Sequence, residues 1–462
     1  MSSSSSSSEE ELTVVIVGAG MAGLSMALSL AKNLGNVKID VLEKRSNALE
    51  QKGSAYGLAL NGQKAMEEIS MTVLEHCRQV GVPMFTGAYM LPWFEVRNAL
   101  WKECQQQPSV TIRTGVEPTS IQETPSGVHV QYKDSNSSST GTTTTIVADL
   151  VIGADGVHSA VRSDVLGLPK ARPMGSMLWR GCVDTTRDGS KLSGIHQTSL
   201  FAAKRPNKTI RIGKTMVMLF SFAKVGVLGW IVSSQLHQHI HDDTTPWQVL
   251  QHEGDEFLET PYTTRQSIQQ ILDESDARDL NHHTKVCTTP LLPSSSWGGR
   301  GRITLIGDAA HAIMPTSGLG GALAFEDVVI LTRQVVAAVQ KRQGTTTNNK
   351  HWKEVEIPLA IQAFQQQRFP RVQRISQEQL ELSKGFRGAQ QLNLWSKDYE
   401  KWVYMGPDAP SHFEPETATK TTTTTDKTKD PKAASPKDDD KKKAVKEEKK
   451  KKKGVFKRLF KR

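Results

Sequence analysis

Six consecutive residues form a glycine-rich loop, Gly18-Ala19-Gly20-Met21-Ala22-Gly23, whose spacing suits the binding of a pyrophosphate. The first glycine of such a loop permits a tight turn, the second lets the main chain approach a phosphate, and the third lets a helix pack on a strand. The amides at the start of that helix then face the phosphates. The loop alone is a weak signal, because glycines that only pack a helix give the same spacing.

The sequence around the loop contains the elements that such a site needs. Residues 12–17 form an apolar run typical of a buried parallel strand, residues 21–34 have apolar positions at helical spacing, and residues 37–42 form a second β-rich run. Glu43, followed by Lys44, ends that run where an acidic residue can bind ribose hydroxyls. Strand, helix and strand predict a doubly wound, Rossmann-type parallel sheet with a dinucleotide site, but do not separate NAD from FAD.

Later segments predict a second kind of sheet. Between residues 174 and 289 the pattern alternates as in an antiparallel sheet, with a helical stretch near 267–279. The apolar stretch 216–232 falls short of a membrane span, so we expect two buried strands, 216–222 and 227–233, around a turn at 224–226. The other expected strands are 110–113, 127–132, 145–152, 179–183 and 303–306, and the other expected helices are 94–104 and 323–340.

These patterns divide the α/β chain into five segments. Residues 135–144 are rich in Ser and Thr and are expected to form a surface loop between two strands. The expected segments are a disordered leader (1–11), the first part of a cofactor-binding domain (12–173), an inserted substrate domain of mostly antiparallel sheet (174–295), a return to the first domain with C-terminal helices (296–405), and a disordered basic tail (406–462).

The net charge of +10 is concentrated at the C-terminus. Residues 426–462 hold 17 Lys and Arg against 7 Asp and Glu, which leaves 41 of each sign in residues 1–425. A formally neutral body gives no reason to expect a specific nucleic-acid partner. In the tail, Phe456, Leu459 and Phe460 lie at i, i+3 and i+4 among cations. This segment fits peripheral contact with an anionic membrane surface, a nuclear address or a merely solvated tail.

Cysteine usage and the N-terminus bear on compartment. The four cysteines lie far apart, without histidines at metal-ligand spacing, which favours a reduced compartment and no metal site. The N-terminus is serine-rich and acidic, unlike a secretory or transit peptide, so a cytoplasmic location is expected. The cysteines are Cys77, Cys104, Cys182 and Cys287.

Two later segments resemble motifs of the class A flavoprotein monooxygenases, the para-hydroxybenzoate and salicylate hydroxylase group. Residues 149–162 resemble the family's DG motif, and Gly307-Asp308-Ala309-Ala310-His311 followed by Pro315 resembles its GD motif. The segments occur in the family's order, and the resemblance spans about residues 12–374. Shorter similarities at 53–61 and 364–371 agree with it.

The resemblance implies FAD as the cofactor and assigns residues to it. Asp308 would bond the ribitol, Pro315 would lie against the isoalloxazine, and the amides of 318–321 would face its pyrimidine edge. Fixed amide dipoles there would stabilise a reduced, negatively charged flavin. The glycines of this segment are Gly318, Gly320 and Gly321.

In the DG segment, the family assigns Asp155, Gly156 and Arg162 to the FAD site and to the approach of NADH or NADPH. A carboxylate at position 155 could instead merely cap a turn. Trp179-Arg180-Gly181 resembles a strand facing the substrate, so Arg180 is, with Pro315, a catalytic candidate; an Arg beside a Trp is as often a surface pair.

Three positions depart from the family pattern. Trp93 stands where the family usually has an arginine at the start of a helix, and Arg97, one turn later, could replace its phosphate contact or could simply be exposed. Leu319 and Ala322 stand where the family has glutamine and asparagine. Both changes remove polar side chains but keep Gly318 and Gly320.

The resemblance implies a monooxygenase that uses NAD(P)H and O2 to insert one oxygen atom into an aromatic or other electron-rich small molecule, through a flavin C4a-hydroperoxide. In such enzymes the cofactor carries the chemistry and the protein orients it. His158 and His311 are then explained by packing or capping rather than by proton transfer. Two alternatives stay open: an epoxidase or oxidase acting on a terpenoid-like substrate, and a flavin-binding tethering protein with little turnover. Substrate identity and oligomeric state are not readable from the sequence.

Overall fold

The computed structural model divides into two units, residues 1–415 and 416–462. All described residues belong to the first unit. The leader up to residue 9, most of the Ser/Thr-rich loop and the tail from residue 415 lie outside them. The described residues are 10–47, 53–84, 86–134, 143–201, 207–235, 241, 243–281, 284–290, 292–293, 297–315, 318–343, 352–383 and 397–414.

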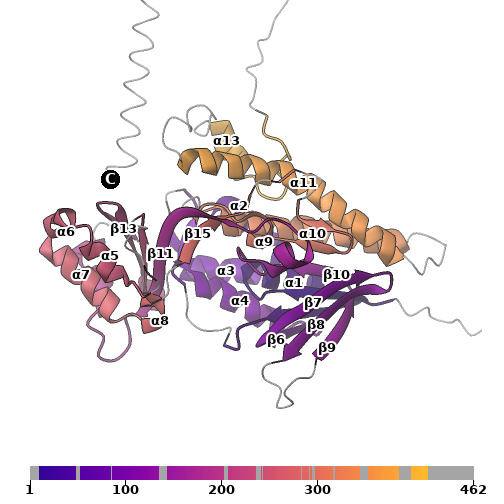
Figure 1. Ribbon diagram of the computed structural model, residues 1–462, viewed down its shortest axis with the longest axis horizontal. Coiled ribbons are helices and arrows are strands. Elements are labelled where there is room, and N and C mark those ends of the chain that lie inside the picture. Colours follow the sequence, from indigo (N-terminus) through magenta and orange to yellow (C-terminus); the bar gives the residue numbers. More distant parts are fainter. Residues whose placement is uncertain are drawn as a thin grey trace, which may run out of the picture. The chain divides into compact units, whose positions relative to one another are not determined.

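A six-stranded sheet forms the centre of the first fold region (Figure 1). Its order is β16-β17-β10-β1-β2-β6, and every pair is parallel except β16 with β17. The expected doubly wound sheet is therefore confirmed. The strands are β1 (Leu12–Val17), β2 (Val37–Glu43), β6 (Val110–Thr114), β10 (Leu150–Gly153), β16 (Gly299–Arg300) and β17 (Ile303–Leu305).

Strand order reverses between β1 and β10, because β2 and β6 continue on one side of β1 while β10 and β17 continue on the other. Ligands of open parallel sheets bind beyond the carboxyl ends of the strands at such a point. The glycine loop follows β1, Glu43 ends β2, the DG segment follows β10 and the GD segment follows β17. One edge of the sheet thus collects all four sequence motifs.

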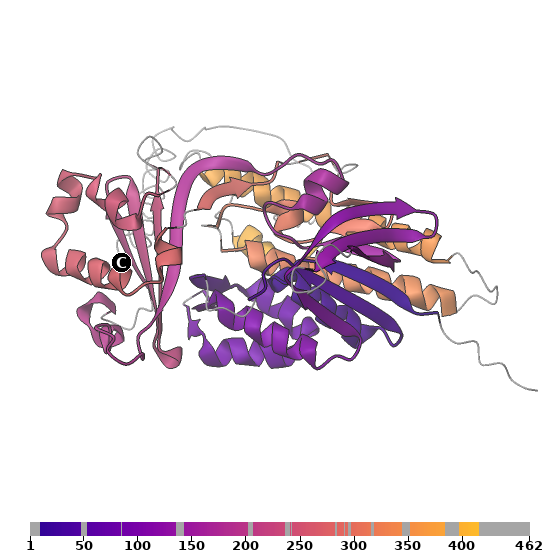
Figure 2. The same ribbon diagram turned by 60° about the horizontal axis from the view of Figure 1, so that its bottom comes forward.

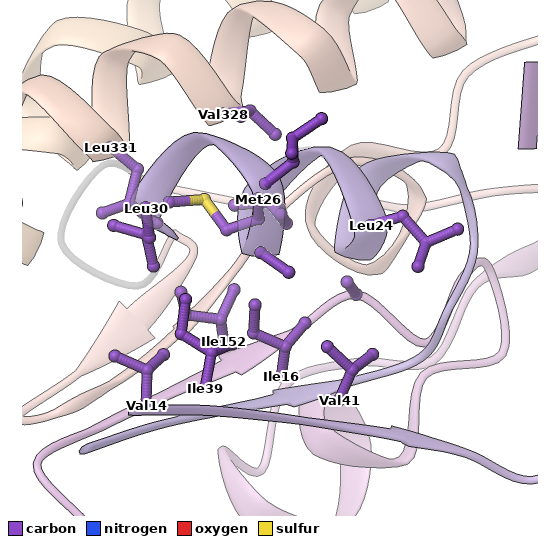
Figure 3. Close-up of a cluster of buried hydrophobic side chains, with 14 of the residues drawn as sticks. Val14, Ile16, Leu24, Met26, Leu30, Ile39, Val41, Ile152, Val328 and Leu331 are labelled. Atoms are coloured by element: carbon purple, nitrogen blue, oxygen red, sulfur yellow. The ribbon is translucent and has the colours of Figure 1, made fainter. Parts of the chain in front are cut away.

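Helices cover this sheet because their apolar faces match its apolar strands. In Figure 3, Leu24, Met26 and Leu30 of α1 (Met21–Asn33) lie against sheet residues such as Ile16 and Ile39. The long helices α10 (Gly320–Gln343) and α11 (Trp352–Ser383) and the helix α4 (Trp93–Gln105) complete this region. None of the described helices is long and apolar enough to cross a membrane.

The second large sheet is antiparallel, with the order β12-β13-β14-β11-β15 (Figure 2). The apolar stretch 216–232 forms β13 and β14 around a turn at Gly226, whose φ is 64°. The strands are β11 (Arg172–Asp184), β12 (Asn207–Ile212), β13 (Thr215–Phe222), β14 (Val227–Ser234) and β15 (Thr284–Thr288).

Short helices cover one face of this sheet and enclose a separate hydrophobic cluster. The expected helix at 267–279 is interrupted, because Asp276 caps a new helix through the amide of Arg278. The helices are α5 (Pro246–Gln251), α6 (Asp255–Glu259), α7 (Tyr262–Asp273) and α8 (Ala277–Leu280). The exact domain boundaries stay a prediction.

The expected single strand at 145–152 is wrong. It is divided at Asp149, whose carboxylate accepts hydrogen bonds from the Thr13 amide and from Lys353 Nζ, both at 2.8 Å. The first part, β9 (Thr143–Ala148), pairs with β8 (Gly127–Asp134) in a sheet with β7 (Val116–Thr124), whereas β10 enters the parallel sheet.

A further small sheet and a pair of helices connect β2 to α4. The similarity at 53–61 corresponds to a strand that leads into a helix. The elements are β3 (Ala55–Leu58), α2 (Leu60–Ile69), α3 (Met71–Val80), β4 (Val82–Pro83) and β5 (Tyr89–Pro92).

Residues 406–414, assigned to the tail from sequence, are packed instead. They follow α13 (Lys397–Val403), and the Pro410 carbonyl accepts a hydrogen bond from Trp402 Nε1 at 2.8 Å. Ala409 is buried, so an apolar contact holds this polar stretch in place.

Candidate functional site

The glycine loop has the geometry that a phosphate cradle requires. Gly18 has a φ of 104°, and a Cβ there would lie 2.5 Å from the Ala154 carbonyl oxygen. A Cβ at Gly23 would lie 1.9 Å from the Gly18 carbonyl oxygen, but one at Gly20 would meet nothing within 4 Å. Gly20 precedes α1, whose N-terminus has no side-chain cap. Open space therefore lies before uncapped helix amides, which is where an anion binds.

Glu43 is tied directly to this loop. Its Oε2 accepts a hydrogen bond from the Ala19 amide at 3.0 Å, and its Oε1 accepts from the amide and Nε of Arg45 at 3.0 and 3.1 Å. The carboxylate is buried, whereas Lys44 is exposed. Glu43 thus holds an oriented negative charge beside the cradle, as a ribose-binding acid would.

The DG segment makes a capped turn. Asp155 Oδ2 accepts hydrogen bonds from the amides of Ala160 and Val161 at 2.8 and 3.2 Å. Burial raises the pKa of Asp155, while hydrogen bonds, first that from Ser159, act in the opposite direction. Capping occupies Oδ2, whereas the buried Oδ1 has no hydrogen-bond partner among the described residues, and a role of Asp155 in the FAD site stays a prediction. The next residue, Gly156, has a φ of 81° and open space where a Cβ would stand.

Arg162 connects the DG segment to the GD segment. It is 1% exposed and donates to the carbonyl oxygens of Pro169, Ala309 and Ala310. Burial lowers the pKa of its guanidinium. These three bonds all go to main-chain carbonyl groups, so Arg162 positions the short helix α9 (Asp308–His311).

The GD segment is held by hydrogen bonds to Asp327 of α10. Asp327 Oδ2 accepts from the Gly307 amide at 2.9 Å and lies 2.5 Å from His311 Nε2. Burial would raise the pKa of Asp327, but the positive charges of His311 and Arg368 hold it below its usual value. Trp297 stacks on the His311 ring with centroids 6.0 Å apart. His311 is therefore a packed, hydrogen-bonded residue, and His158 is exposed.

Asp308 itself is exposed, although surrounding protein raises its pKa by desolvation; His311 and Arg180 lower it. A Cβ on Gly320 would lie 3.8 Å from Asp308 Oδ1, so the start of α10 lies beside this carboxylate. Pro315 and Gly318 are exposed before that helix start, and residues 316 and 317 lie outside the described residues. A Cβ on Gly321 would collide with the Tyr56 ring at 2.5 Å.

Arg97 is not a surface residue. It is 1% exposed, and its guanidinium lies 5.1 Å from the centroid of the Trp93 ring. Trp93 in turn packs where a Cβ on Gly53 would stand, at 3.5 Å. The expectation of a merely exposed arginine is wrong, and a phosphate contact through Arg97 stays a prediction.

Arg180 lies on the antiparallel sheet and acts electrostatically on Asp308. Burial lowers the pKa of Arg180, while the charges of Asp308 and Asp279 raise it. Arg180 is nevertheless exposed. In the sheet register Arg180 pairs with Ile231, and Ile231 pairs with Met218, so all three side chains share one face.

The sequence analysis did not predict the buried network of two acids and two arginines that contacts the GD segment. Glu326 accepts from Arg368 Nη1 at 2.7 Å and from Arg371 Nε at 2.8 Å, and Arg368 Nε donates to Asp327 at 2.8 Å. Adjacent acids in an otherwise apolar helix were the available signal, since buried charges require partners.

Comparisons with known proteins identify the family. A family model described as FAD binding domain matches residues 11–351. The chain is 26% identical over 396 residues to the FAD-dependent monooxygenase olcE of Penicillium canescens, covering 79% of each chain. It is 25% identical over 345 residues to the 3-hydroxybenzoate 6-hydroxylase of Klebsiella oxytoca, covering 69% of this chain and 78% of that protein.

Fold comparison agrees. The structure of Klebsiella pneumoniae HpxO complexed with FAD and uric acid matches with a TM-score of 0.59 at 20% identity, covering 82% of this chain and 92% of the other. The chain therefore belongs to the FAD binding domain family, and its resemblance to class A flavoprotein monooxygenases is confirmed. FAD is its cofactor.

The residues present fit that cofactor. Glycines with open space at Gly20, Gly156 and Gly318 lie along the edge of the sheet, together with uncapped amides of α1 and the Asp308 carboxylate. No cluster of metal-ligating side chains occurs in the described part of the chain, in which all four cysteines are free thiols.

Proposed function

We propose that this chain is an FAD-dependent, NAD(P)H-consuming monooxygenase that transfers one oxygen atom from O2 to an electron-rich, largely apolar small molecule. The bound flavin supplies the redox chemistry, and the protein supplies orientation and exclusion of water. The observation that carries the proposal is the hydrophobic cluster in which Phe220, with Met218 and Ile231 packed against it, lies with Phe94 of α4. It brings the face of the antiparallel sheet that carries Arg180 toward the first region, where the cofactor is expected, and the mutual effect of Arg180 and Asp308 on their pKa values agrees with this.

The face that carries Arg180 is suited to an apolar substrate. Met218 and Ile231 share its row, and Phe220 lies two residues further along the same face. Phe220 belongs to a hydrophobic cluster with Phe94 of α4, which shows that this face is directed at the first region. A mostly apolar surface with one cation favours an aromatic or polycyclic substrate that carries an electron-rich or anionic group.

Trp230, the neighbour of Ile231 on β14, lies on the opposite face. It is fully buried in the other cluster of this sheet, and its Nε1 donates to Ser275 Oγ at 2.8 Å. The alternation of strand side chains separates Trp230 from Ile231, so Trp230 is a core residue.

The names of relatives support substrates of this kind. One relative is named asperlicin C monooxygenase, and another aurachin C monooxygenase/isomerase. We propose that the choice between hydroxylation and epoxidation depends on the double bond or ring that the substrate presents beside Arg180.

Anaerobic flavin reduction tests the proposal. Protein reconstituted with FAD would be mixed with NADPH or NADH in the presence of phenolic, heteroaromatic or terpenoid compounds, and the loss of flavin absorbance would be timed. We expect one compound class to accelerate reduction and, after admission of O2, to gain one oxygen atom by mass spectrometry. A yellow protein that neither nicotinamide reduces would support the tethering alternative.

Arg180→Ala and Arg172→Ala make a matched pair for the same assay, because both arginines lie on β11 and are exposed. Only Arg180→Ala should abolish the acceleration by substrate. Equal effects of the two variants would remove Arg180 from the site.

Peripheral membrane contact through the basic tail remains part of the proposal. Phe456, Leu459 and Phe460 among lysines and arginines favour an anionic lipid surface. Full-length protein and a variant with serine at these three positions would be sedimented with phosphatidylserine vesicles. Equal sedimentation would exclude docking by this segment.

A further inference from the structure

The C-terminal segment 397–414 lies beyond the part of the chain that matches the family model, which ends at residue 351. It consists of α13 and the turns that follow. Three aromatic rings hold it together: Tyr399 and Trp402 have centroids 5.6 Å apart, and Phe413 lies 5.3 Å from Tyr399 and 5.7 Å from Trp402.

One set of contacts joins this segment to residues 318–321, which we call the flavin loop because their amides are expected to face the flavin. Tyr399, Trp402 and Val403 share a buried hydrophobic cluster with Leu319 and with other residues around the start of α10. Leu319 and Ala322 stand where the resembled family has glutamine and asparagine. Their apolar side chains are thus buried together with α13. The other members of the cluster include Ile313, Ala322 and Leu323.

A second set of contacts runs through buried charges. Arg371 donates from Nη1 to the Trp402 carbonyl oxygen at 3.1 Å and from Nη2 to the Val403 carbonyl oxygen at 2.8 Å. The same guanidinium lies 4.7 Å from the centroid of the Trp402 ring and donates to Glu326. It therefore contacts the end of α13 and Glu326 of α10 at once.

Glu326 is linked in turn to the GD segment by further hydrogen bonds. It is bridged by Arg368 to Asp327, which accepts from the Gly307 amide directly before Asp308. Asn61 Nδ2 also donates to Glu326, at 2.8 Å. All four charged groups of this network are fully or almost fully buried, so each depends on the others for its partner.

The outer end of the segment is fastened to α2 and α10. Lys64 Nζ donates to the Met405 carbonyl oxygen at 3.2 Å, and Arg333 pairs with both Asp408 and Glu68 at 2.8 Å. Gly406, with a φ of 86°, lets the chain turn against Lys64. The segment is thus held at both ends against the helices that begin beside the flavin loop.

We propose that residues 397–414 are a positioning element of the FAD site, in which Trp402 and Arg371 hold the start of α10 and the GD segment in their binding geometry. The loop is held there by the apolar contacts that Leu319 and Ala322 make in the cluster with α13. The inference rests on the proposed placement of the flavin beside Asp308 and Gly320.

Trp402→Ala and Trp352→Ala in the full-length chain test the proposal as a matched pair. Trp402 is 4% exposed and carries Arg371 over its ring, and Trp352 is 3% exposed and carries Arg342 over its ring at 5.4 Å. Trp352 is the first residue of α11 and lines a small pocket with Leu12, at the end of β1 opposite the glycine loop. The readouts are the thermal unfolding midpoint without FAD, the dissociation constant for FAD, and the visible circular dichroism of the bound flavin.

We expect both variants to unfold at a lower temperature than the parent protein. Only Trp402→Ala should weaken FAD binding, by about fivefold to tenfold, and change the visible circular dichroism of the bound flavin. Trp402→Phe should restore most of the affinity. If Trp402→Ala does not fold, Phe413→Ala removes one ring of the aromatic group and should change the same two readouts less strongly. An unchanged dissociation constant and dichroism in the folded variant would overturn the proposal.

A double-mutant cycle with Leu319→Ala identifies the route. If Trp402 acts through the loop, the two substitutions should weaken FAD binding by less together than the product of their separate effects. Independent, multiplicative effects would refute action through Leu319. These measurements need no turnover. A protein that binds FAD but never oxidises a nicotinamide would contradict the proposed function, and the FAD-binding measurements would still test the role of residues 397–414.

Discussion

Arg162 Nη1 lies 3.0 Å from the carbonyl oxygen of Ala310, although 148 residues separate them in the chain. This bond joins the motif after β10 to the motif after β17, and with the Ala309 bond it fixes the carbonyl end of α9. The side of α9 that carries Asp308 is therefore oriented by a residue of the other motif. Two motifs read separately in the sequence form one structural unit.

Replacing this arginine by lysine should loosen that unit. Lysine keeps the charge but cannot direct several fixed donors at separate carbonyl groups. We expect Arg162→Lys to lower the free energy of unfolding by about 1–3 kcal/mol and to weaken FAD binding, because a buried carbonyl loses its partner. Urea denaturation and FAD titration would measure both. Arg172→Lys, at an exposed position of β11, is the control and should change neither.

The glycine loop predicts opposite outcomes for two neighbouring substitutions. Gly20→Ala adds a methyl group to open space, so the protein should fold with an unchanged melting temperature but bind FAD at least about tenfold more weakly, because the cradle is narrowed. Gly23→Ala places a Cβ against the Gly18 carbonyl and should destabilise the fold itself. Melting curves with and without FAD distinguish the two variants. Normal FAD affinity in Gly20→Ala would show that the pyrophosphate does not bind at this loop.

Asp308→Ala tests the GD segment. Its carboxylate lies beside the start of α10 and is expected to bind a flavin hydroxyl, so the variant should lose about tenfold in FAD affinity. Flavin content after purification and fluorescence titration would report the change. The exposed Asp188, replaced in the same way, should retain full occupancy. Full FAD content in Asp308→Ala would show that the ribitol is bound elsewhere.

Adjacent residues of β13 separate substrate binding from stability. Leu219 is 1% exposed in the helix-covered cluster, so Leu219→Ala should cost about 2–4 kcal/mol of unfolding free energy. Met218 lies on the Arg180 face and is only half-buried. We expect Met218→Ala to be milder in stability but to alter which compounds accelerate flavin reduction. The opposite pattern would mean that the faces are assigned in reverse.

Glu378 predicts a pH dependence of stability. Burial raises the pKa of this carboxyl group from 4.5 to about 7, and Arg374, whose Nε lies 2.6 Å away, only partly opposes it. The folded protein then binds a proton that the unfolded chain releases, so stability should fall as the pH rises from 4.5 to about 7 and level off above it.

Glu378→Gln should remove most of that decline and be more stable than the parent at pH 8 by about 2 kcal/mol. Melting temperatures between pH 5 and pH 8 would show it. Glu259→Gln, at an exposed position, is the control and should follow the parent curve. A parent protein with no loss of stability over this range would contradict the raised pKa.

Local patterns were sufficient for much of the fold. The apolar runs at β1, β2, β13 and β14 and the helical spacing of α1 appear in the structure at nearly the expected residues, because each is a short-range response to burial on one or two faces. The strand predicted at 145–152 failed, because its division depends on Asp149 bonding to Thr13 and Lys353, which are distant in sequence. Pairing partners, rather than strand propensity, decided it.

The sequence by itself determined the class of site: a pyrophosphate loop, an acid after the second strand and two flavin motifs in order, all of which depend on local main-chain geometry. Tertiary structure alone decided which side chains meet. It buried Arg97 against Trp93, set Arg180 and Trp230 on opposite faces, and packed residues 406–414 beside the flavin loop. The reason is physical: sheet register and the pairing of buried charges are set by partners that lie tens of residues apart, such as Arg180 with Ile231 and Glu326 with Arg371, and no local pattern encodes them.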